Sequence, residues 1–586
     1  MTEFLSCKRV VWLALCLGTA RLATAQEKQA EAATEAADNA AAPGATDAAS
    51  IESSTEAPLT EVTTTAIPTD AQLQASGAVI GRIDIKVVDV FDTDNPKESG
   101  KAYRAANYLH INTREQTVRP QLLFKSGEPY MRHILDETER NLRARRYLED
   151  ASILPVAYHA DTNTVDLLVR VHDVWTLNPG ATLGRSGGAN HTGIQLDESN
   201  LLGLGKSISV DRDQDVDRSA WKFGYRDPNF LSTRWELGLR YYDNSDGHLR
   251  GVNINHPFYS LDTRWSAALD ASSEERIDKR FEQAQVVDQY VVRQKSAGVQ
   301  AGWSTGLRTY RGSGWVQRWS LGYRDDAQRF SPDPVLGTLT LPVDKVWRYP
   351  WVGLSWFQDK YEVTRNRDRI ARTEDVYVGL SLNTTLGYAA ESWGSTANAL
   401  IASIQLADTY RLSERQYLSG NLSFGGRHQS DAWHAALYSG SLRYDFRETN
   451  KALFVISLSH AHLENPDDSQ QLYLGSDEGM RGYVLRFRSG TERSVLALEQ
   501  RVYTDKQILR LLSVGGAAFI DVGHIAGETF DAPNGRSTFA DVGFGLRLGN
   551  IRSSRGDIFH LDLAYPLNAD DKDRKLQFSV TTKTSF

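Results

Sequence analysis

The stretch Arg234-Trp235-Glu236-Leu237-Gly238-Leu239-Arg240-Tyr241-Tyr242 decides the fold class of this 586-residue chain. Its large apolar side chains fall on every second residue, and the residues between them form a second, more polar row. Successive side chains of a β-strand point to opposite faces, so this spacing predicts a strand with one apolar and one polar face. The apolar row is Trp235, Leu237, Leu239 and Tyr241, and the other row is Glu236, Gly238, Arg240 and Tyr242.

The same period of two continues from about residue 176 to residue 586. Trp315 to Arg324 and Val376 to Leu382 are two further examples, and turn residues separate such segments. Many alternating segments of ~10 residues are the sequence signature of a transmembrane β-barrel. A soluble β-sandwich would alternate as well, but it needs neither so many successive strands nor so many aromatic residues near strand ends. The pattern therefore favours a membrane barrel over residues 176–586.

The N-terminal residues predict export from the cytoplasm. Lys8-Arg9 precedes an apolar run over residues 10–20, and Ala23-Thr24-Ala25 supplies a cleavage site, so residues 1–25 are expected to be a signal peptide. The alternative is a lipidation box at Leu13-Ala14-Leu15-Cys16, although a bulky leucine stands directly before its cysteine. Both cysteines of the chain lie within this signal, so the exported protein would form no disulfide.

Residues 26–78 have the composition of a disordered acidic linker, with Ala, Thr, Glu and scattered Pro. Beyond the signal, no stretch approaches the ~18 to 20 consecutive apolar residues that a membrane helix needs. A chain of this kind can cross a membrane only as a closed sheet. The net charge of −8 and the pI near 6.0 give no support for nucleic-acid binding.

Residues 79–175 predict a small α+β domain. Its hydrophobic periodicity changes from strand-like to helix-like and back again. This order also fits a generic α+β domain, so it does not define a family by itself. The expected elements are one strand, two helices and two strands, over residues 80–88, 115–124, 131–144, 151–159 and 164–172.

A second stretch, Leu474 to Tyr483, is too polar to span a membrane and too rich in glycine for a stable helix. Its last four residues, Met480, Arg481, Gly482 and Tyr483, are similar to the VRGF/Y motif of the BamA/TamA-type outer-membrane assembly and translocation superfamily, with Met in place of Val. Phe519-Ile520-Asp521-Val522-Gly523 is similar to the FxDxG motif of that superfamily. Glu499, with Arg501, stands in the strand where the superfamily carries a luminal glutamate. The resemblance covers about residues 79–586 and includes Phe586, the terminal aromatic residue that barrel-assembly machinery recognises in its clients.

The resemblance implies a fold, a location and a role. Residues 79–175 would be a periplasmic POTRA domain, whose exposed strand edge receives unfolded polypeptide clients by β-augmentation. Residues 176–586 would be a barrel of 16 strands among outer-membrane lipids, and a periplasmic scaffold protein would be a further partner. The work would be insertion or translocation of polypeptides, without enzymatic activity or a cofactor. A passive channel, or a lipid or solute transporter on the same scaffold, is the alternative.

The number of strands stays open between 16 and about 20. The larger count arises because residues 294–325 and residues 433–463 each resemble an added hairpin. An even number is expected, since the N-terminal domain and the end of the C-terminal strand would both lie in the periplasm.

Alternation assigns Asp521 and Glu499 to the barrel interior. Each carboxylate falls on the face opposite an apolar row, and a carboxylate that faced lipid would be costly. We therefore expect a loop over about residues 464–493 to fold into the lumen, where the fork of Arg481 pairs with Asp521 and Glu499. The alternative is a solvated Arg481 on an external loop.

Two other patterns carry no predicted chemistry. Gly184-Arg185-Ser186-Gly187-Gly188 matches GxSxG, but no helix follows it, so it is expected to be the turn after the first barrel strand. His460 and His462 share a strand face without a third ligand nearby in sequence, so no metal site is predicted.

Overall fold

The computed structural model describes residues 67–583, apart from residues 92, 94, 95, 97, 98, 371, 372, 509–511, 528–534, 551–557 and 572. The predicted signal peptide, most of the predicted linker and Phe586 lie outside these residues, so the predictions for them stay predictions.

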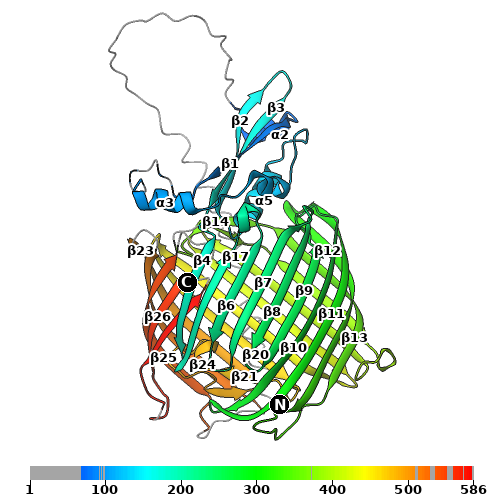
Figure 1. Ribbon diagram of the computed structural model, residues 1–586, viewed down its shortest axis with the longest axis vertical. Coiled ribbons are helices and arrows are strands. Elements are labelled where there is room, and N and C mark those ends of the chain that lie inside the picture. Colours follow the sequence, from blue (N-terminus) through cyan, green and yellow to red (C-terminus); the bar gives the residue numbers. More distant parts are fainter. Residues whose placement is uncertain are drawn as a thin grey trace, which may run out of the picture. The chain divides into compact units, whose positions relative to one another are not determined.

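The N-terminal domain folds as a three-stranded sheet with helices packed against it (Figure 1). The strand order is β1-β3-β2, in which β1 runs parallel to β3 and β2 antiparallel to it. One apolar core joins helical residues such as the fully buried Leu135 to sheet residues such as the fully buried Ile153. No helix among the described residues is long and apolar enough to cross a membrane. The elements are α2 Asp70–Ala75, β1 Val79–Val88, α3 Lys101–Leu109, α4 Glu115–Val118, η1 Arg119–Gln121, α5 Arg132–Arg143, β2 Leu148–His159 and β3 Thr164–Asp173.

Helices α2 and α3 are absent from the sequence prediction. The expectation of a disordered linker up to residue 78 is wrong for its last part, because α2 lies there. Thr69 caps this helix reciprocally with Gln72, and Leu73 is fully buried in the core of the domain. One buried leucine and one capping box are therefore enough to form helix α2, although its composition resembles that of the predicted linker before it.

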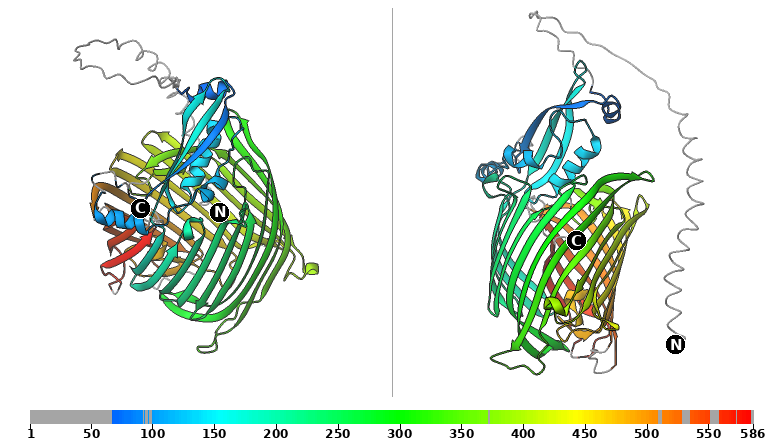
Figure 2. Two further views of the ribbon diagram at one scale, coloured as in Figure 1. Left: turned by 45° about the horizontal axis from the view of Figure 1, so that its top comes forward. Right: turned by 90° about the vertical axis from the view of Figure 1, so that its right-hand side faces the viewer.

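The rest of the described chain builds a closed antiparallel barrel of twenty strands, which confirms the predicted fold class. The count of 16 that the resemblance implies is wrong and the count of about 20 is right, because residues 294–325 and 433–463 both enter the wall. Figures 1 and 2 show the strands inclined in one sense around the ring. The wall strands are β4 Leu177–Ser186, β5 Ala189–Glu198, β6 Ser207–Gln214, β7 Ser219–Phe230, β8 Trp235–Asn244, β9 Gly247–His256, β10 Trp265–Glu282, β11 Gln285–Tyr310, β12 Ser313–Pro332, β13 Lys345–Asp359, β16 Ser381–Ala389, β17 Ala399–Ser413, β18 Gln416–Gln429, β19 Ala432–Thr449, β20 Ala452–Glu464, β23 Glu492–Ile508, β24 Leu512–Ala526, β25 Thr538–Asn550, β26 Ile558–Pro566 and β27 Gln577–Lys583.

One predicted wall strand is divided in the structure. The first part of Val376 to Leu382 belongs to β15 Thr373–Tyr377, which pairs with β14 Tyr361–Arg365 in a separate two-stranded sheet. The wall strand β16 begins only at Ser381. Alternation does not distinguish the two cases, because a hairpin beside the wall has the same period of two.

Two long connections leave the wall. Strand β4 begins at the end of the barrel that follows the N-terminal domain, which we call the proximal end, and the opposite end is the distal end. Because wall strands alternate in direction, residues 360–380 join β13 to β16 at the proximal end and residues 465–491 join β20 to β23 at the distal end. We call the first the proximal hairpin, which contains β14 and β15. The second is the distal loop, which contains β21 Leu472–Leu474, η4 Ser476–Glu478 and β22 Arg488–Gly490, and short turns η2 Leu201–Gly203 and η3 Glu391–Trp393 complete the described elements.

The barrel closes between its last and first strands at a seam with a very short ladder. Among the described residues, β27 pairs with β4 only through Val580 and Arg185. The ladders beside the seam are continuous over residues 558–564 of β26 and over residues 177–186 of β4. Ladder hydrogen bonds hold neighbouring strands together, so the seam is the most weakly paired junction of this part of the wall.

Candidate functional site

The distal loop folds against the inner wall at β24 and β25. Its strands β21 and β22 pair with each other, and Gly479 turns the chain with a φ of +96°, a conformation that suits glycine. Leu474 and Met480 are fully buried and pack with Ile525 of β24 and Phe539 of β25. The loop is therefore held by an apolar cluster before any charge is considered.

Arg481 bridges two carboxylates of the wall. Its Nε and Nη2 donate to the two oxygens of Asp521, each at 2.8 Å, and its Nη1 donates to Oε2 of Glu499 at 2.6 Å. The side chain of Asp521 has no exposed surface, and that of Arg481 is 17% exposed. The contact expected from strand parity is present, and its geometry requires the planar fork of arginine.

Phe519 supports the same guanidinium. The Cζ of Arg481 lies 3.3 Å from the centroid of the Phe519 ring, in a cation–π contact. Because these charges are buried, the removal of one partner leaves another charge uncompensated, which typically costs ~3 to 5 kcal/mol. The docked state of the distal loop therefore depends on the complete cluster.

Two glycines allow the loop and the wall to approach each other. A Cβ on Gly482 would lie 2.6 Å from the Cβ of Asp541, and a Cβ on Gly523 would lie 2.6 Å from the Sδ of Met480. The N–H of Gly482 also donates to Oδ2 of Asp541 at 3.0 Å. At both positions an added Cβ would lie closer than 3 Å to side-chain atoms of the opposite segment, so a larger side chain would have to displace them.

Tyr483 completes the four-residue motif. Its hydroxyl lies 3.0 Å from the carbonyl oxygen of Ala540 and 3.0 Å from Oδ1 of Asn568. Its ring packs against Phe487 and Phe539, with centroids 4.8 and 5.6 Å away. The motif thus contacts β25 and the connection that follows β26.

Asp541 is part of the site, although the sequence prediction does not include it. The register places Phe519 opposite Gly543 and Asp521 opposite Asp541. A Cβ on Gly543 would lie 2.5 Å from the ring of Phe519, so Gly543 leaves space for this ring. Gly523 leaves space for Met480 of the distal loop in the same way. The signal is present in the sequence, because Phe539-Ala540-Asp541-Val542-Gly543 repeats the pattern of residues 519–523 on the next strand.

Arg501 connects the Arg481 cluster to the proximal hairpin. Its Nε donates to Oε1 of Glu499 at 2.7 Å, and its Nη1 donates to the carbonyl oxygen of Arg367 at 3.3 Å. Arg367 in turn donates to Oδ2 of Asp445 at 3.0 Å. The connected residues, which we call the luminal charge chain, are Asp521, Arg481, Glu499, Arg501, Arg367, Asp368, Arg443 and Asp445.

The tip of the proximal hairpin is buried in the lumen. Ile370 is 3% exposed and packs in an apolar cluster with Leu453 and Tyr503. Burial alone would raise the pKa of Asp368, but the cations of Arg443 and Arg501 outweigh it and lower that pKa below its ordinary value. The distal loop and the proximal hairpin are therefore linked along one wall of the barrel, through Glu499 and Arg501 of β23. Sequence patterns do not reveal this link, because a polar connection has the same composition whether it enters a lumen or stays outside.

Helix α5 contacts the proximal end of the barrel. Arg143 donates from Nε and Nη2 to the two oxygens of Asp375 in β15, at 2.8 and 2.7 Å. Oε1 of Glu137 accepts a hydrogen bond from the N–H of Leu261 at 2.7 Å, and burial raises the pKa of Glu137 to about 7. The proximal hairpin thus contacts both the N-terminal domain and the luminal charge chain.

The distal loop also contacts the other side of the seam. The N–H of Leu485 donates to the carbonyl oxygen of Gly187 at 3.1 Å, and Oγ of Ser186 donates to Oδ1 of Asp477 at 3.1 Å. Gly187 has a φ of +53°, and a Cβ there would lie 2.2 Å from the N of Leu485. The GxSxG segment is the turn after the first wall strand, as expected, and it is a docking point for the loop.

The remaining residues of interest show no chemistry of their own. His460 lies 2.9 Å from Oγ of Ser494 through Nδ1, and His462 packs beside Tyr438. No group of three or more His, Cys, Asp or Glu residues within the described ranges is arranged to hold a metal ion.

Fold and site define a class: a bacterial outer-membrane β-barrel with a POTRA-like N-terminal domain and an inward-folded loop. No family model matches the chain. A putative outer membrane protein assembly factor of Treponema pallidum (strain Nichols) is 26% identical over 187 residues, which is 30% of this chain and 22% of that relative. The match thus spans about a fifth of the curated relative's length. This match and the motifs at Arg481 and Asp521 make the chain similar to the BamA/TamA-type assembly and translocation superfamily.

Solved structures show a likeness in fold alone. CdiB from Escherichia coli is 13% identical, with a TM-score of 0.45 over 87% of this chain and 77% of that one. CdiB from Acinetobacter baumannii is 14% identical, with a TM-score of 0.43 over 86% and 74%. BamA from Haemophilus ducreyi lacking POTRA domains 1–3 is 12% identical, with a TM-score of 0.39 over 86% and 85%.

Proposed function

We propose that this barrel assists the insertion or translocation of polypeptides at the outer membrane. The observation that carries the proposal is the position of the distal loop, which docks on both sides of the seam. On one side Arg481 holds Asp521, and on the other side Leu485 holds Gly187. A loop that bridges the most weakly paired junction controls whether that junction can open, because undocking removes contacts from both sides at once.

The N-terminal domain supplies a surface for the client. Strand β2 is an edge of the described three-stranded sheet, and Pro155 lies within it, as is common on edge strands. Leu154 and Val156 on either side of this proline are 51% and 41% exposed. An unfolded segment with free backbone groups can extend such an edge by β-augmentation, with its apolar side chains beside Leu154 and Val156.

No catalytic step is required by this proposal. The luminal charge chain consists of ion pairs that can break and re-form, so the barrel would alternate between a closed and an open arrangement. A client strand that pairs with β4 or β27 would replace the short seam ladder and so favour the open arrangement.

A disulfide across the seam tests this proposal. Arg185 and Val580 are paired directly, so the Arg185→Cys/Val580→Cys variant has the Cα spacing that a disulfide needs. The native cysteines, Cys7 and Cys16, lie in the predicted signal and leave the exported chain free of competing thiols. The matched control, Leu183→Cys/Thr192→Cys, joins β4 to β5 away from the seam.

The readout is the profile of outer-membrane and secreted proteins in a strain that carries only the variant. We expect the oxidised seam variant to lose specific outer-membrane or secreted proteins and to recover them on reduction, while the control behaves as wild type. An unchanged protein profile in the oxidised strain would exclude the proposal. If only the uptake of small solutes changes, the barrel is a channel or transporter instead.

A further inference from the structure

The outward face of the barrel carries an uninterrupted row of polar side chains, near the distal ends of β8 and β9 and about midway along β10 and β11. Tyr241 of β8 is paired directly with Arg250 of β9, Arg250 with Ser273 of β10, and Ser273 with Lys295 of β11. Directly paired residues of a sheet lie on the same face, and Tyr241 belongs to the outward apolar row of β8. Arg250 and Lys295 therefore point away from the lumen, and both are exposed.

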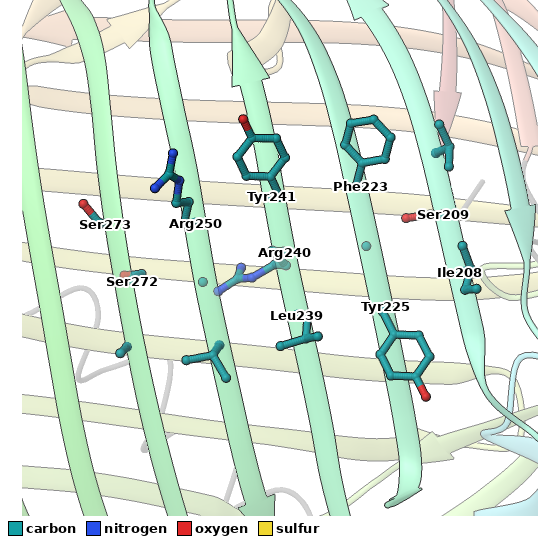
Figure 3. Close-up of a pocket in the computed structure, with 15 residues that line it drawn as sticks. Ile208, Ser209, Phe223, Tyr225, Leu239, Arg240, Tyr241, Arg250, Ser272 and Ser273 are labelled. Carbon is teal, nitrogen blue, oxygen red and sulfur yellow. The ribbon is translucent and has the colours of Figure 1, made fainter.

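A groove of about 630 Å³ lies beside this row on the same face. Arg250 and Ser273 stand at one end of the groove, and Figure 3 shows Tyr241 and Phe223 at the same level with Leu239 and Tyr225 further along the strands. Arg240, drawn behind its ribbon, points to the other side of the sheet. The groove is thus mainly apolar along the strands and basic at its distal end. Its apolar lining is Ile208, Val210, Phe223, Tyr225, Leu239, Tyr241, Val252 and Ala271.

The depth of the row matches the level of lipid headgroups. Trp265, Trp303 and Trp319 are paired outward residues of β10, β11 and β12 and form an aromatic belt toward the proximal end. From Trp303 back to Lys295 the strand extends about 27 Å, or about 20 Å in height at the usual strand tilt. The apolar band of an outer-membrane barrel is about 25 Å tall, so Lys295 lies near the opposite interface. That interface belongs to the outer leaflet, because the N-terminal domain lies in the periplasm.

No ion pair to Arg250 or Lys295 is formed by the described part of the chain. Two other outward cations are paired: Arg293 contacts Glu275 at 2.6 Å, and Arg348 contacts Asp325 at 3.0 Å. Within the described ranges, no carboxylate lies within ion-pair distance of Arg250 or Lys295. Among the described residues, Arg250 contacts the ring of Tyr241, with its Cζ 5.8 Å from the ring centroid. The two cations stand two strands apart, about 10 Å between backbones, with the hydroxyl of Ser273 between them.

We propose that this face binds a phosphorylated lipid of the outer leaflet. An acyl chain lies in the groove beside Leu239, and a headgroup phosphate lies between Arg250 and Lys295 over Ser273. A free anion is not the natural occupant, because it would contact only the cations and would leave the apolar lining of the groove without a ligand. The lipid would order the wall at β8 to β11, well away from the seam in the strand order.

Binding of fluorescent lipid A to the full chain in detergent micelles tests the proposal. The probes are bisphosphorylated lipid A, lipid A without its phosphates, and inorganic phosphate as a competitor. The variant is Arg250→Gln/Lys295→Gln, and the matched control is Arg240→Gln, which removes a cation from the luminal face of β8. Heat-modified mobility on gels confirms that each variant remains a folded barrel.

We expect the double variant to bind bisphosphorylated lipid A on the order of 30-fold more weakly, since each basic residue near an anionic lipid contributes a factor of about five. The control should bind as wild type does, and the lipid without phosphates should bind wild type as weakly as the intact lipid binds the double variant. A second variant, Ala271→Leu, fills the groove and should weaken binding while both cations remain. Equal affinity of wild type and the double variant, equal affinity for both lipids, or full competition by millimolar phosphate would overturn the proposal.

Discussion

Asp521 and Asp541 are directly opposite each other on β24 and β25, and neither is exposed to solvent. Like charges in directly paired positions are unfavourable unless nearby donors compensate them. Asp521 receives two hydrogen bonds from Arg481, and Asp541 receives one from the N–H of Gly482. Two adjacent residues of the distal loop therefore donate hydrogen bonds to the two carboxyl groups. Docking of the loop and the ionisation of these wall groups consequently depend on each other.

The two carboxylates should respond differently to neutralisation. Asp521→Asn removes the partner of a buried guanidinium and should destabilise loop docking by ~3 to 5 kcal/mol. Asp541→Asn keeps an acceptor for Gly482 and leaves the pair between Arg481 and Asp521 intact, so it should change docking by less than about 1 kcal/mol. Hydrogen exchange of residues 476–486 measures docking directly. Equal protection of the loop in both variants would contradict the assignment of Asp521 as its main anchor.

A methyl group at Gly482 should undock the loop without changing any charge. The added Cβ would meet the Cβ of Asp541 at 2.6 Å, and overpacking of this kind typically costs ~1 to 3 kcal/mol. Gly482→Ala should therefore accelerate cleavage of the distal loop by an external protease. Asp541→Gly, which removes the opposing Cβ, should partly restore resistance in the double variant. A protease-resistant Gly482→Ala loop would show that the approach is looser than the structure indicates.

Release of the proximal hairpin should open a path through the lumen. Arg367→Gln removes the cation that pairs with the buried Asp445, while Ile370 remains as the apolar anchor. We expect larger or more frequent conductance steps in planar bilayers, because the hairpin tip occupies the lumen. Arg411→Gln is the matched control, since Arg411 pairs with Glu362 of the same hairpin at an exposed position. If the two variants conduct alike, the hairpin does not limit the path.

The contact of helix α5 with the barrel should weaken as the pH rises. The pKa of Glu137 is about 7 in the folded chain against an ordinary value of 4.5. Between pH 4.5 and about pH 7, the folded state therefore keeps a proton on Glu137 that the unfolded state has lost. Its contribution is fully present below pH 4.5 and is lost as the pH rises through about 7, a change on the order of 3 kcal/mol. Glu137→Gln keeps the acceptor for Leu261 and should remove this pH dependence.

Hydrogen exchange of α5 at pH 5.5 and pH 8.5, corrected for intrinsic exchange rates, measures this contact. Wild type should lose protection at the higher pH, and Glu137→Gln should not. Glu115→Gln serves as the control, because Glu115 forms an exposed pair with Arg119. A pH response that survives in Glu137→Gln would assign the effect to another group.

Local rules of the chain account for much of the fold and for the centre of the site. Alternation in residues such as Leu239 and Tyr241 assigns each side chain to lipid or lumen, so it orients Asp521 and Glu499 without knowledge of their neighbours. The same rule does not fix the strand number, because closure at twenty rather than sixteen depends on how the strands pair around the ring. The same rule also assigns Val376 to a wall strand, whereas in the structure Val376 belongs to the separate hairpin of β14 and β15.

The sequence by itself determined which residues face inward and that Arg481 needs a carboxylate partner, because side-chain alternation and the cost of a charge in lipid are local properties of a strand. Only the tertiary structure decided that Asp541 lies opposite Asp521, that Arg501 joins Glu499 to Arg367, and that the distal loop reaches Gly187 across the seam. These contacts join residues far apart in the chain, and their geometry follows from ring closure and from the entry of two connections into one lumen.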